Sequence, residues 1–168
     1  ITESGFQAGT DIFLALDCAA SEYYDRETKR YEIQTGMFLD KYELCSYYKD
    51  LLEDFPALKS IEDPFDEYDY EGWSVFMKEV VGRMDRKVMV VGDDLYTTNS
   101  ETVKKGIENS WTNSLLLKVN QIGTITEAVD AAKLMFDADM DVIVSHRSGE
   151  TSSTLISDLA VGIGAKYI

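Results

Sequence analysis

The chain has 168 residues, which is enough for one domain with a sizeable hydrophobic core. Hydrophobic residues make up 45% of the sequence and only two residues are proline, so the composition argues against extended disorder. The formal net charge of −15 repels nucleic-acid phosphates and anionic membranes, and it favours a divalent cation where carboxylates converge. Because of this charge we expect no nucleic-acid partner. No apolar run approaches the roughly 20 residues that span a bilayer, so we expect no membrane span.

Cysteine and histidine are scarce, which narrows the kinds of site that the chain can build. Cys18 lies in an apolar run and Cys45 in a helical pattern, so we expect buried free thiols rather than a disulfide. His146 is the only histidine, which argues against a zinc site made of His and Cys. Free thiols, and an N-terminus unlike a signal peptide, favour the cytoplasm.

Hydrophobic periodicity predicts an alternation of strands and helices. In chain order we expect a strand at 11–17, a hairpin at 23–33, a helix over 44–55, a strand at 58–61, a helix over 73–81, a strand at 88–91, a helix from 100, a strand at 114–119, a helix from 124, a strand at 141–145, a helix around 155–159 and the start of a strand at 165–168. Such an alternation indicates a parallel sheet in one domain, either doubly wound or closed into a (β/α) barrel.

Two of the expected helices begin with the spacing of a capping box, in which a Ser or Thr precedes a Glu by three residues. Thr98 and Glu101 have this spacing before the helix at 100, and Thr124 and Glu127 have it at the helix from 124. We therefore expect Thr98 and Thr124 to cap these helices.

Five of the predicted strands end at a polar or charged residue that is costly to bury: Asp17, Glu62, Asp93, Lys118 and His146. In a parallel barrel the carboxyl ends of the strands meet at one face, and that face carries the chemistry. A single polar strand end is typical of an ordinary loop border, but five of them indicate a site.

The residue types at these strand ends suit a divalent cation and a general base. The three carboxylates offer the oxygen ligands that Mg²⁺ prefers. Lys118 beside such a cation can act as a general base. The segment 145–149 adds a guanidinium, two hydroxyls and a glycine turn, which suit a phosphate or a carboxylate as well as an ordinary loop. Because neighbouring strand residues point to opposite sides, we expect only one of Asp93 and Asp94 to face the metal.

Five segments of the chain resemble, in order and with suitable spacing, the successive active-site motifs of the enolase family. They read LDCAASE at 16–22, SIEDPF at 60–65, VGDDL at 91–95, LLLKVNQIGT at 115–124 and VSHRSGET at 144–151. The resemblance covers the whole chain, and the last two segments are the most specific.

The resemblance implies a fold and a domain organisation. The fold is α/β, a partial TIM-type (β/α) barrel of the enolase kind with about six strands and their intervening helices. Residues 1–168 would form an incomplete catalytic barrel domain, without the N-terminal domain, the first barrel strands and the end of the barrel. In the family a second active-site lysine lies on the eighth strand, and the spacing from Ser148 places it directly after Ile168. Residues 1–168 alone are therefore expected to be inactive.

The resemblance also implies an activity, the Mg²⁺-dependent interconversion of 2-phosphoglycerate and phosphoenolpyruvate plus water by a glycolytic lyase. Asp17, Glu62 and Asp93 would bind Mg²⁺, and Lys118 would remove the carbon-bound proton. Glu62, Asp93 and Lys118 would also contact the substrate. Arg147 and Ser148 would hold the phosphate, and the backbone and side chains of Ser145 and His146 would complete that wall of the site.

Family members are typically homodimers, so the resemblance implies a homo-oligomeric full-length protein that acts on a small phosphorylated substrate in the cytoplasm. Two alternatives stay open. Another enolase-superfamily acid dehydratase would act on a different carboxylate, which the phosphate-binding segment 145–148 argues against. A barrel fragment that serves as a structural or interaction module would not be catalytic, which the intact motifs argue against.

Overall fold

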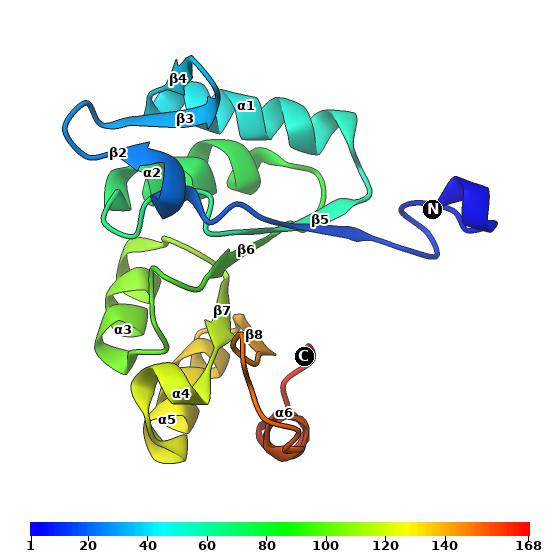
Figure 1. The fold of residues 1–168 in the computed structure, drawn as a ribbon, viewed down its shortest axis with the longest axis vertical. Helices are drawn as coiled ribbons and strands as arrows, with labels where there is room; N and C mark the ends of the chain where they lie inside the picture. The colour runs from blue at the N-terminus through cyan, green and yellow to red at the C-terminus, as the bar shows by residue number, and fades with distance from the viewer. The chain divides into compact units, whose positions relative to one another are not determined.

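The computed structural model describes residues 1–168. The chain forms two compact units, Ile1–Val90 and Val91–Ile168. In each unit parallel strands are joined by helices, as the alternation in the sequence predicts (Figure 1). The first unit contains, in chain order, η1 (Thr2–Ser4), β1 (Leu14–Asp17), η2 (Ala20–Tyr23), β2 (Tyr24–Asp25), β3 (Arg30–Gln34), β4 (Met37–Leu39), α1 (Lys41–Asp54), β5 (Leu58–Glu62), α2 (Tyr70–Val75), the π-helical turn η3 (Phe76–Val80) and η4 (Val81–Arg83).

Strands β1 and β5 are parallel neighbours, and β2, β3 and β4 form a separate antiparallel sheet. The predicted hairpin is therefore present and is extended by a third strand, β4, which the sequence pattern did not indicate. The turn between β3 and β4 contains Gly36 at a φ of 78°, a backbone conformation that favours glycine.

Helix α1 begins with a full capping box. The Asp40 side chain accepts hydrogen bonds from the backbone N–H groups of Tyr42 (2.8 Å) and Glu43 (2.9 Å), and the Glu43 carboxylate accepts the backbone N–H of Asp40 (2.9 Å). These bonds satisfy N–H groups that the first helical turn leaves without partners. Leu44 and Tyr48, two residues of the predicted apolar face, are buried, so the predicted helix is confirmed.

The second predicted helix is present but is not regular. It begins as α2, continues as the π-helical turn η3 and ends in η4. Trp73, Phe76 and Val80 are buried as predicted, whereas Met77 and Val81 are only half-buried. A π-helical turn is wider than an α-helical turn, so it rotates the residues within and after it away from the positions that α-helical spacing predicts.

The core of the first unit is a cluster of aromatic rings around Phe65. Its ring centroid lies 5.9 Å from that of Tyr31, 6.0 Å from Tyr48, 6.1 Å from Trp73 and 5.8 Å from Phe76. The edge-to-face and tilted contacts are geometries that aromatic pairs prefer. All five side chains are at most 2% exposed, so Tyr48, Trp73 and Phe76 form core as the sequence predicts. Phe55, which the same pattern assigns to the core, follows the end of α1 and is 53% exposed.

Two buried carboxylate residues lie beside this aromatic cluster. The Tyr31 hydroxyl donates to Oδ2 of Asp69 (2.9 Å) and accepts the backbone N–H of Asp66 (3.1 Å). Lys41 pairs with Oδ1 of Asp69 at 2.7 Å. Because a buried polar group without partners is costly, the Tyr31 hydroxyl stabilises this part of the fold.

Strand β6 (Met89–Gly92) begins in the last two residues of the first unit and ends in the second. The second unit then contains, in chain order, α3 (Ser100–Asn109), β7 (Ser114–Leu117), α4 (Val119–Ile122), α5 (Ile125–Asp137), β8 (Asp141–Val144) and α6 (Leu155–Ile163). Strand β7 lies between β6 and β8 and is parallel to both. All four residues of β7 are buried, α5 packs against β7 and β8, and α6 packs against β8. The predicted start of a further strand is present as a single parallel bridge between Ile143 and Tyr167.

The prediction that Thr98 caps α3 was wrong. The cap is Asn99, whose side-chain oxygen accepts the backbone N–H of Glu101 (2.9 Å). Thr98 is fully buried and its hydroxyl oxygen accepts the backbone N–H of Lys118 (2.9 Å). Spacing from the glutamate could not separate two adjacent residues that are both good helix caps.

The prediction that Thr124 caps α5 is confirmed. Its hydroxyl oxygen accepts the backbone N–H of Glu127 (3.2 Å), and the hydroxyl donates to the Glu127 carboxylate (2.5 Å). Gly123 separates α4 from α5 at a φ of 102°, which residues other than glycine rarely adopt.

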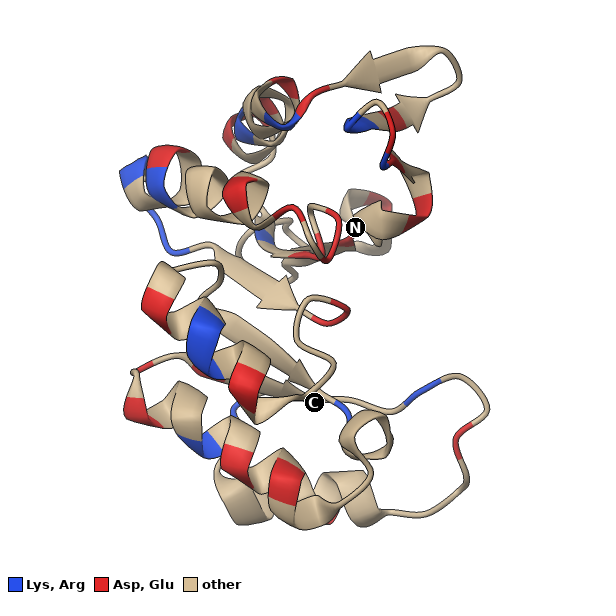
Figure 2. Ribbon diagram, turned by 90° about the vertical axis from the view of Figure 1, so that its left-hand side faces the viewer, with Lys and Arg blue, Asp and Glu red and all other residues tan.

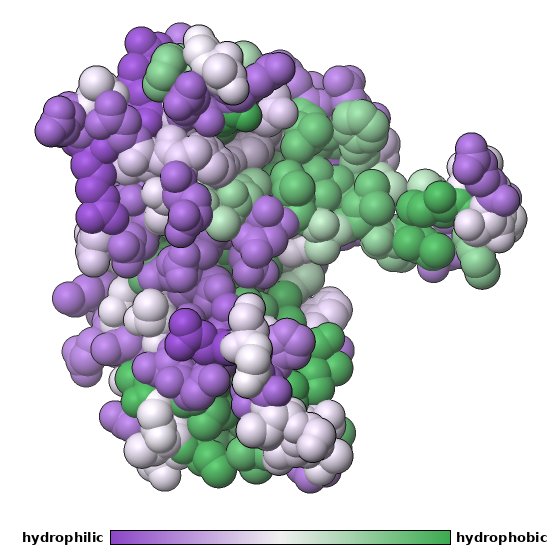
Figure 3. Space-filling view, in the orientation of Figure 1, coloured by the Kyte–Doolittle hydropathy of each residue, from purple (hydrophilic) through white to green (hydrophobic).

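Many charged residues lie on the helices and loops of each unit (Figure 2), and the strands β6 and β7 carry none. Large apolar side chains are exposed along the N-terminal segment and β1 (Figure 3), among them Phe6, Phe13 and Leu14 at 50%, 52% and 42%. This stretch is therefore suited to contact with a further apolar surface.

None of the helices is both long enough and apolar enough to cross a membrane.

The substitution Tyr31→Phe should lower the free energy of unfolding of the full-length protein by about 1–3 kcal/mol, because Asp69 and the N–H of Asp66 lose a buried partner. Urea denaturation measures the change. Tyr42→Phe is the matched control: its hydroxyl also donates to a carboxylate, that of Glu71 (2.6 Å), but its side chain is 57% exposed. The control should change the free energy by less than about 0.5 kcal/mol. An equal loss of free energy of unfolding in Tyr31→Phe and Tyr42→Phe would show that the burial of the Tyr31 hydroxyl does not matter.

Candidate functional site

The carboxyl ends of the strands of the second unit carry Asp93, Lys118 and Ser145. Each of these residues directly follows its strand: Asp93 follows β6, Lys118 follows β7 and Ser145 follows β8. The backbone N–H of Ser145 donates to the carbonyl of Leu117 (2.9 Å), which continues the pairing of β7 and β8 past the end of β8. Because the strands are parallel neighbours, the three residues lie along one edge of the sheet.

Lys118 and Asp93 form an ion pair at this edge, in which Nζ of Lys118 donates to Oδ2 of Asp93. The two side chains are only 15% and 13% exposed. Their attraction is therefore less screened than that of a surface pair. Asp94 is exposed whereas Asp93 is buried, and a carboxylate oxygen of each lies within 4.8 Å of the other.

Two residues that the sequence analysis did not assign to the site, Thr98 and Gln121, complete the surroundings of this pair. The Thr98 hydroxyl, which accepts the backbone N–H of Lys118, donates to Oε1 of Gln121 (3.0 Å). Nε2 of Gln121 donates to Oδ1 of Asp93 (3.0 Å). Gln121 follows Lys118 by three residues, a spacing that places two residues on one side of a helical turn. That spacing is the sequence signal that could have found it.

The loop between β6 and α3 places both Asp93 and Thr98, and Tyr96 anchors this loop. The backbone N–H of Tyr96 donates to the carbonyl of Asp93 (3.1 Å). Its side chain is 1% exposed, and its hydroxyl is hydrogen-bonded to that of Thr112 (2.7 Å). The ring packs so closely against Gly106 of α3 that a Cβ there would overlap it. Glycine at this position is therefore a packing requirement.

The first unit contributes two further strand ends, which carry Asp17 and Glu62. The two residues are register partners on the parallel strands β1 and β5, so they lie side by side at the carboxyl ends. The backbone N–H of Cys18 donates to the carbonyl of Glu62 (2.9 Å), and Asp17 accepts the N–H of Ala19 (3.1 Å). Burial raises the pKa of the Cys18 thiol to about 11, so this thiol is neutral at neutral pH. The donors available at these strand ends are carboxylate oxygens, which suit Mg²⁺.

The segment after β8 is an exposed loop. His146, Arg147 and Ser148 are all exposed. The backbone N–H of Glu150 donates to the carbonyl of Arg147 (3.1 Å), and Gly149 takes a φ of 75° in this turn. A cavity of about 270 Å³ lies between α4, this loop and the start of α6. The structure thus pairs Lys118 with Asp93 and aligns Asp17 with Glu62, and it leaves these loop side chains open to solvent.

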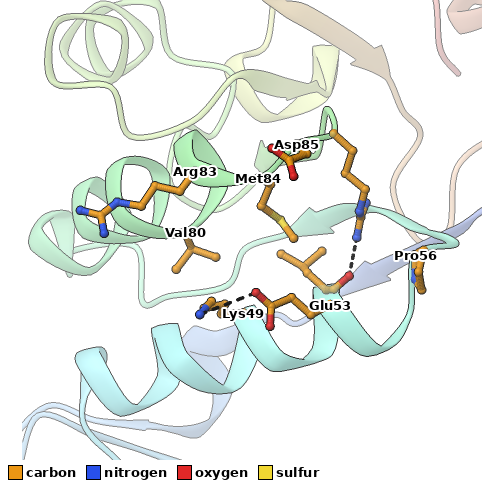
Figure 4. A pocket seen from close by; sticks show the side chains of 9 residues that line it. Lys49, Glu53, Pro56, Val80, Arg83, Met84 and Asp85 are labelled. Atoms are coloured by element: carbon orange, nitrogen blue, oxygen red, sulfur yellow. Dashed lines mark hydrogen bonds and ion pairs between the residues drawn. The ribbon is translucent and has the colours of Figure 1, made fainter.

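A larger cavity, of about 320 Å³, lies in the first unit beside the C-terminal half of α1 (Figure 4). Three of its charged side chains have partners within the chain: Lys49 pairs with Glu53 (3.6 Å), and Arg86 donates to the carbonyls of Leu52 (2.7 Å) and Leu58 (2.6 Å). The Arg86 guanidinium thereby links the C-terminal part of α1 to the start of β5 through hydrogen bonds. We assign a structural role to this region and no ligand.

The chain matches known proteins over its whole length. The model of the family described as enolase, C-terminal TIM barrel domain, matches residues 1–168. Three relatives named enolase align with all 168 residues: those of Thermococcus kodakarensis at 48% identity, Pyrococcus furiosus at 50% and Thermococcus gammatolerans at 47%. The chain spans 38% of the length of each of these relatives. The family match and the parallel strands joined by helices confirm the predicted TIM-type barrel fold.

The substitution Gly106→Ala should destabilise the full-length protein by about 1–3 kcal/mol, because the added methyl group displaces the buried ring of Tyr96. Thermal or urea denaturation measures the loss. Gly162→Ala is the matched control: it also lies within a helix, α6, but its added Cβ meets no atom of this chain within 4 Å. This control should be neutral or stabilising by up to about 1 kcal/mol. If both substitutions stabilise the protein, the Tyr96 ring does not fill the space at Gly106.

Proposed function

Because this chain belongs to the enolase family, whose C-terminal barrel model matches residues 1–168, we propose that the protein containing it is a glycolytic lyase. The proposed reaction interconverts 2-phosphoglycerate and phosphoenolpyruvate plus water. The observation that carries the proposal is the pairing of Lys118 with Asp93 at adjacent carboxyl ends of β7 and β6. A candidate proton acceptor, Lys118, and a candidate metal ligand, Asp93, thus lie next to each other and are both shielded from solvent.

We assign one Mg²⁺ to Asp17, Glu62 and Asp93. The donor chemistry of each unit supports the assignment. Asp17 and Glu62 are side by side in the first unit, and in the second unit Asp93 presents a shielded carboxylate at a strand end. Mg²⁺ bound there supplies positive charge that stabilises the negative charge developing on the substrate carboxylate.

Lys118 is the proposed base that removes the proton from the carbon next to the substrate carboxylate. Such a proton is very weakly acidic, because its removal places a second negative charge on a group that already carries one. Lys118 in its neutral form accepts this proton at Nζ, and the positive charge that it gains stabilises the developing dianion. Glu62, Asp93 and Lys118 contact the substrate in this proposal.

The phosphate of the substrate is assigned to the loop after β8. Arg147 offers a planar guanidinium that can bind phosphate oxygens through two hydrogen bonds, and Ser148 adds a hydroxyl donor. Ser145 and His146 complete this wall. The exposure of the loop leaves these groups available to a ligand. A different enolase-superfamily carboxylate substrate would have no use for this set of phosphate donors.

We further propose that the full-length protein is a homo-oligomer that acts in the cytoplasm. A coupled assay on the full-length protein, with 2-phosphoglycerate and Mg²⁺, tests the function. Formation of phosphoenolpyruvate supports it. Turnover of another 2-hydroxy acid alone would favour a different superfamily dehydratase, and no turnover of any such acid would favour a non-catalytic module.

The substitution Lys118→Ala should lower turnover by about 10⁴-fold, the upper end of what a positioned general base contributes, because the carbon acid is so weak. The direct measurement is exchange of the substrate's C2 proton with deuterated solvent. Lys166→Ala is the matched control, since Lys166 also pairs with an aspartate, Asp141 (2.9 Å), but at the opposite end of β8. The control should exchange as wild type does. Unchanged exchange in Lys118→Ala would show that another group is the base.

Asp93 rather than Asp94 is the proposed metal ligand, because Asp93 is buried at the strand end and Asp94 is exposed. Asp93→Asn should weaken Mg²⁺ binding to the full-length protein by at least about tenfold more than Asp94→Asn, since it removes a charged oxygen donor. Isothermal titration calorimetry measures both constants. Equal losses would mean that the ligand is shared or misassigned.

A further inference from the structure

Four residues of the second unit form a closed circuit of hydrogen bonds around the candidate base. The backbone N–H of Lys118 donates to the Thr98 hydroxyl oxygen (2.9 Å), and that hydroxyl donates to Oε1 of Gln121 (3.0 Å). Nε2 of Gln121 donates to Oδ1 of Asp93 (3.0 Å), and Oδ2 of Asp93 accepts Nζ of Lys118. The circuit therefore starts at the backbone of Lys118 and returns to its side chain.

Two arms of hydrogen bonds run from Lys118 and both end at Asp93, which only accepts, and this fixes the orientation of the members of the circuit. The Thr98 oxygen already accepts the N–H of Lys118, so its proton is available for Oε1 of Gln121. The amide of Gln121 must then present its NH₂ group to Asp93, since the opposite orientation would place an oxygen against the carboxylate. Both carboxylate oxygens of Asp93 are thus held, one by Gln121 and one by Lys118.

The backbone that presents Thr98 adopts an unfavourable conformation. Thr97 and Thr98 have φ values of 45° and 58°, a region that β-branched residues rarely occupy because of steric clashes. The conformation is held by neighbouring bonds: the N–H of Thr97 donates to the carbonyl of Asp93 (2.8 Å), and that of Asn99 donates to the carbonyl of Tyr96 (2.8 Å). Backbone strain of this kind is found mostly at functional sites.

We propose that Thr98 and Gln121 are positioning residues for the reaction: they hold Asp93 and Lys118 in the arrangement that proton removal requires. The proposal rests on the proposed function, because it assigns these residues to the same base. Neither residue needs to touch the substrate. Their effect is geometric, since a displacement of about 1 Å at a catalytic group can cost about 100-fold in rate.

Three variants of the full-length protein test the proposal. Thr98→Val keeps the shape but deletes the hydroxyl, and Gln121→Met keeps the chain length but deletes the amide. Each should lower kcat by about 10- to 100-fold and leave KM within about threefold of wild type, because substrate binding contacts are kept. Thr98→Ser restores the hydroxyl and should restore kcat to within about threefold. If Thr98→Val fails to fold, Gln121→Met still tests the circuit, because the N–H of Lys118 keeps its partner.

Ser114→Ala is the control for a purely structural effect. It also deletes a buried hydroxyl, on the same strand that carries Lys118, but at the opposite end and outside the circuit. It should leave kcat unchanged. Wild-type kcat in both Thr98→Val and Gln121→Met would overturn the proposal, and so would an equal loss of kcat in Ser114→Ala.

A crystal structure of Thr98→Val separates this proposal from the proposed function. We expect Nζ of Lys118 to lie beyond hydrogen-bond distance of Asp93 in that variant. An unchanged pair would overturn the positioning role. If the wild-type protein lacked the proposed turnover while the pair separated in the variant, the function would be wrong and the positioning role would stand.

Discussion

Parallel pairing of neighbouring strands is the constraint on which the site of the second unit depends. Strands β6 and β7 run in the same direction, so the residues that follow them, Asp93 and Lys118, emerge at the same edge of the sheet. Hydrogen-bonded strands lie about 4.8 Å apart, close enough for the two side chains to meet. Antiparallel pairing would place the same residues at opposite ends. The apolar residues that place β6 and β7 side by side in the sheet therefore also bring Asp93 and Lys118 together.

Bringing a charged pair into a mostly buried position has a cost that the surrounding polar groups offset. Removing a lysine and an aspartate from water is unfavourable unless both are hydrogen-bonded. Here each oxygen of Asp93 has a donor, and no buried side-chain nitrogen or oxygen of the chain lacks a partner. Gln121 is well suited to this position because its amide can accept from Thr98 and donate to Asp93 at the same time. A glutamate or a leucine could not do both.

The sequence indicates where these strands end because the signal is local. Asp17 and Lys118 each stand at the end of an apolar run, and a polar residue there is visible without knowledge of tertiary contacts. Thr98 has no such signal. Its spacing from a glutamate predicts a helix cap, and its actual partner is 20 residues away in the chain, at Lys118. The π-helical turn η3 was missed for a similar reason, since its packing partners are distant in sequence.

The polar circuit and the packing around it are linked through one loop. The residues between β6 and α3 carry Asp93 at one end and Thr98 at the other, and the buried ring of Tyr96 lies between them. Thr97 and Thr98 have strained backbone conformations. Without contacts from other parts of the chain, this loop would move to a less strained conformation. The ring of Tyr96, packed against Gly106, prevents that relaxation. The core of the second unit thus supplies the stability that keeps a strained backbone in place, and the strained backbone directs the Thr98 hydroxyl towards Lys118 and Gln121.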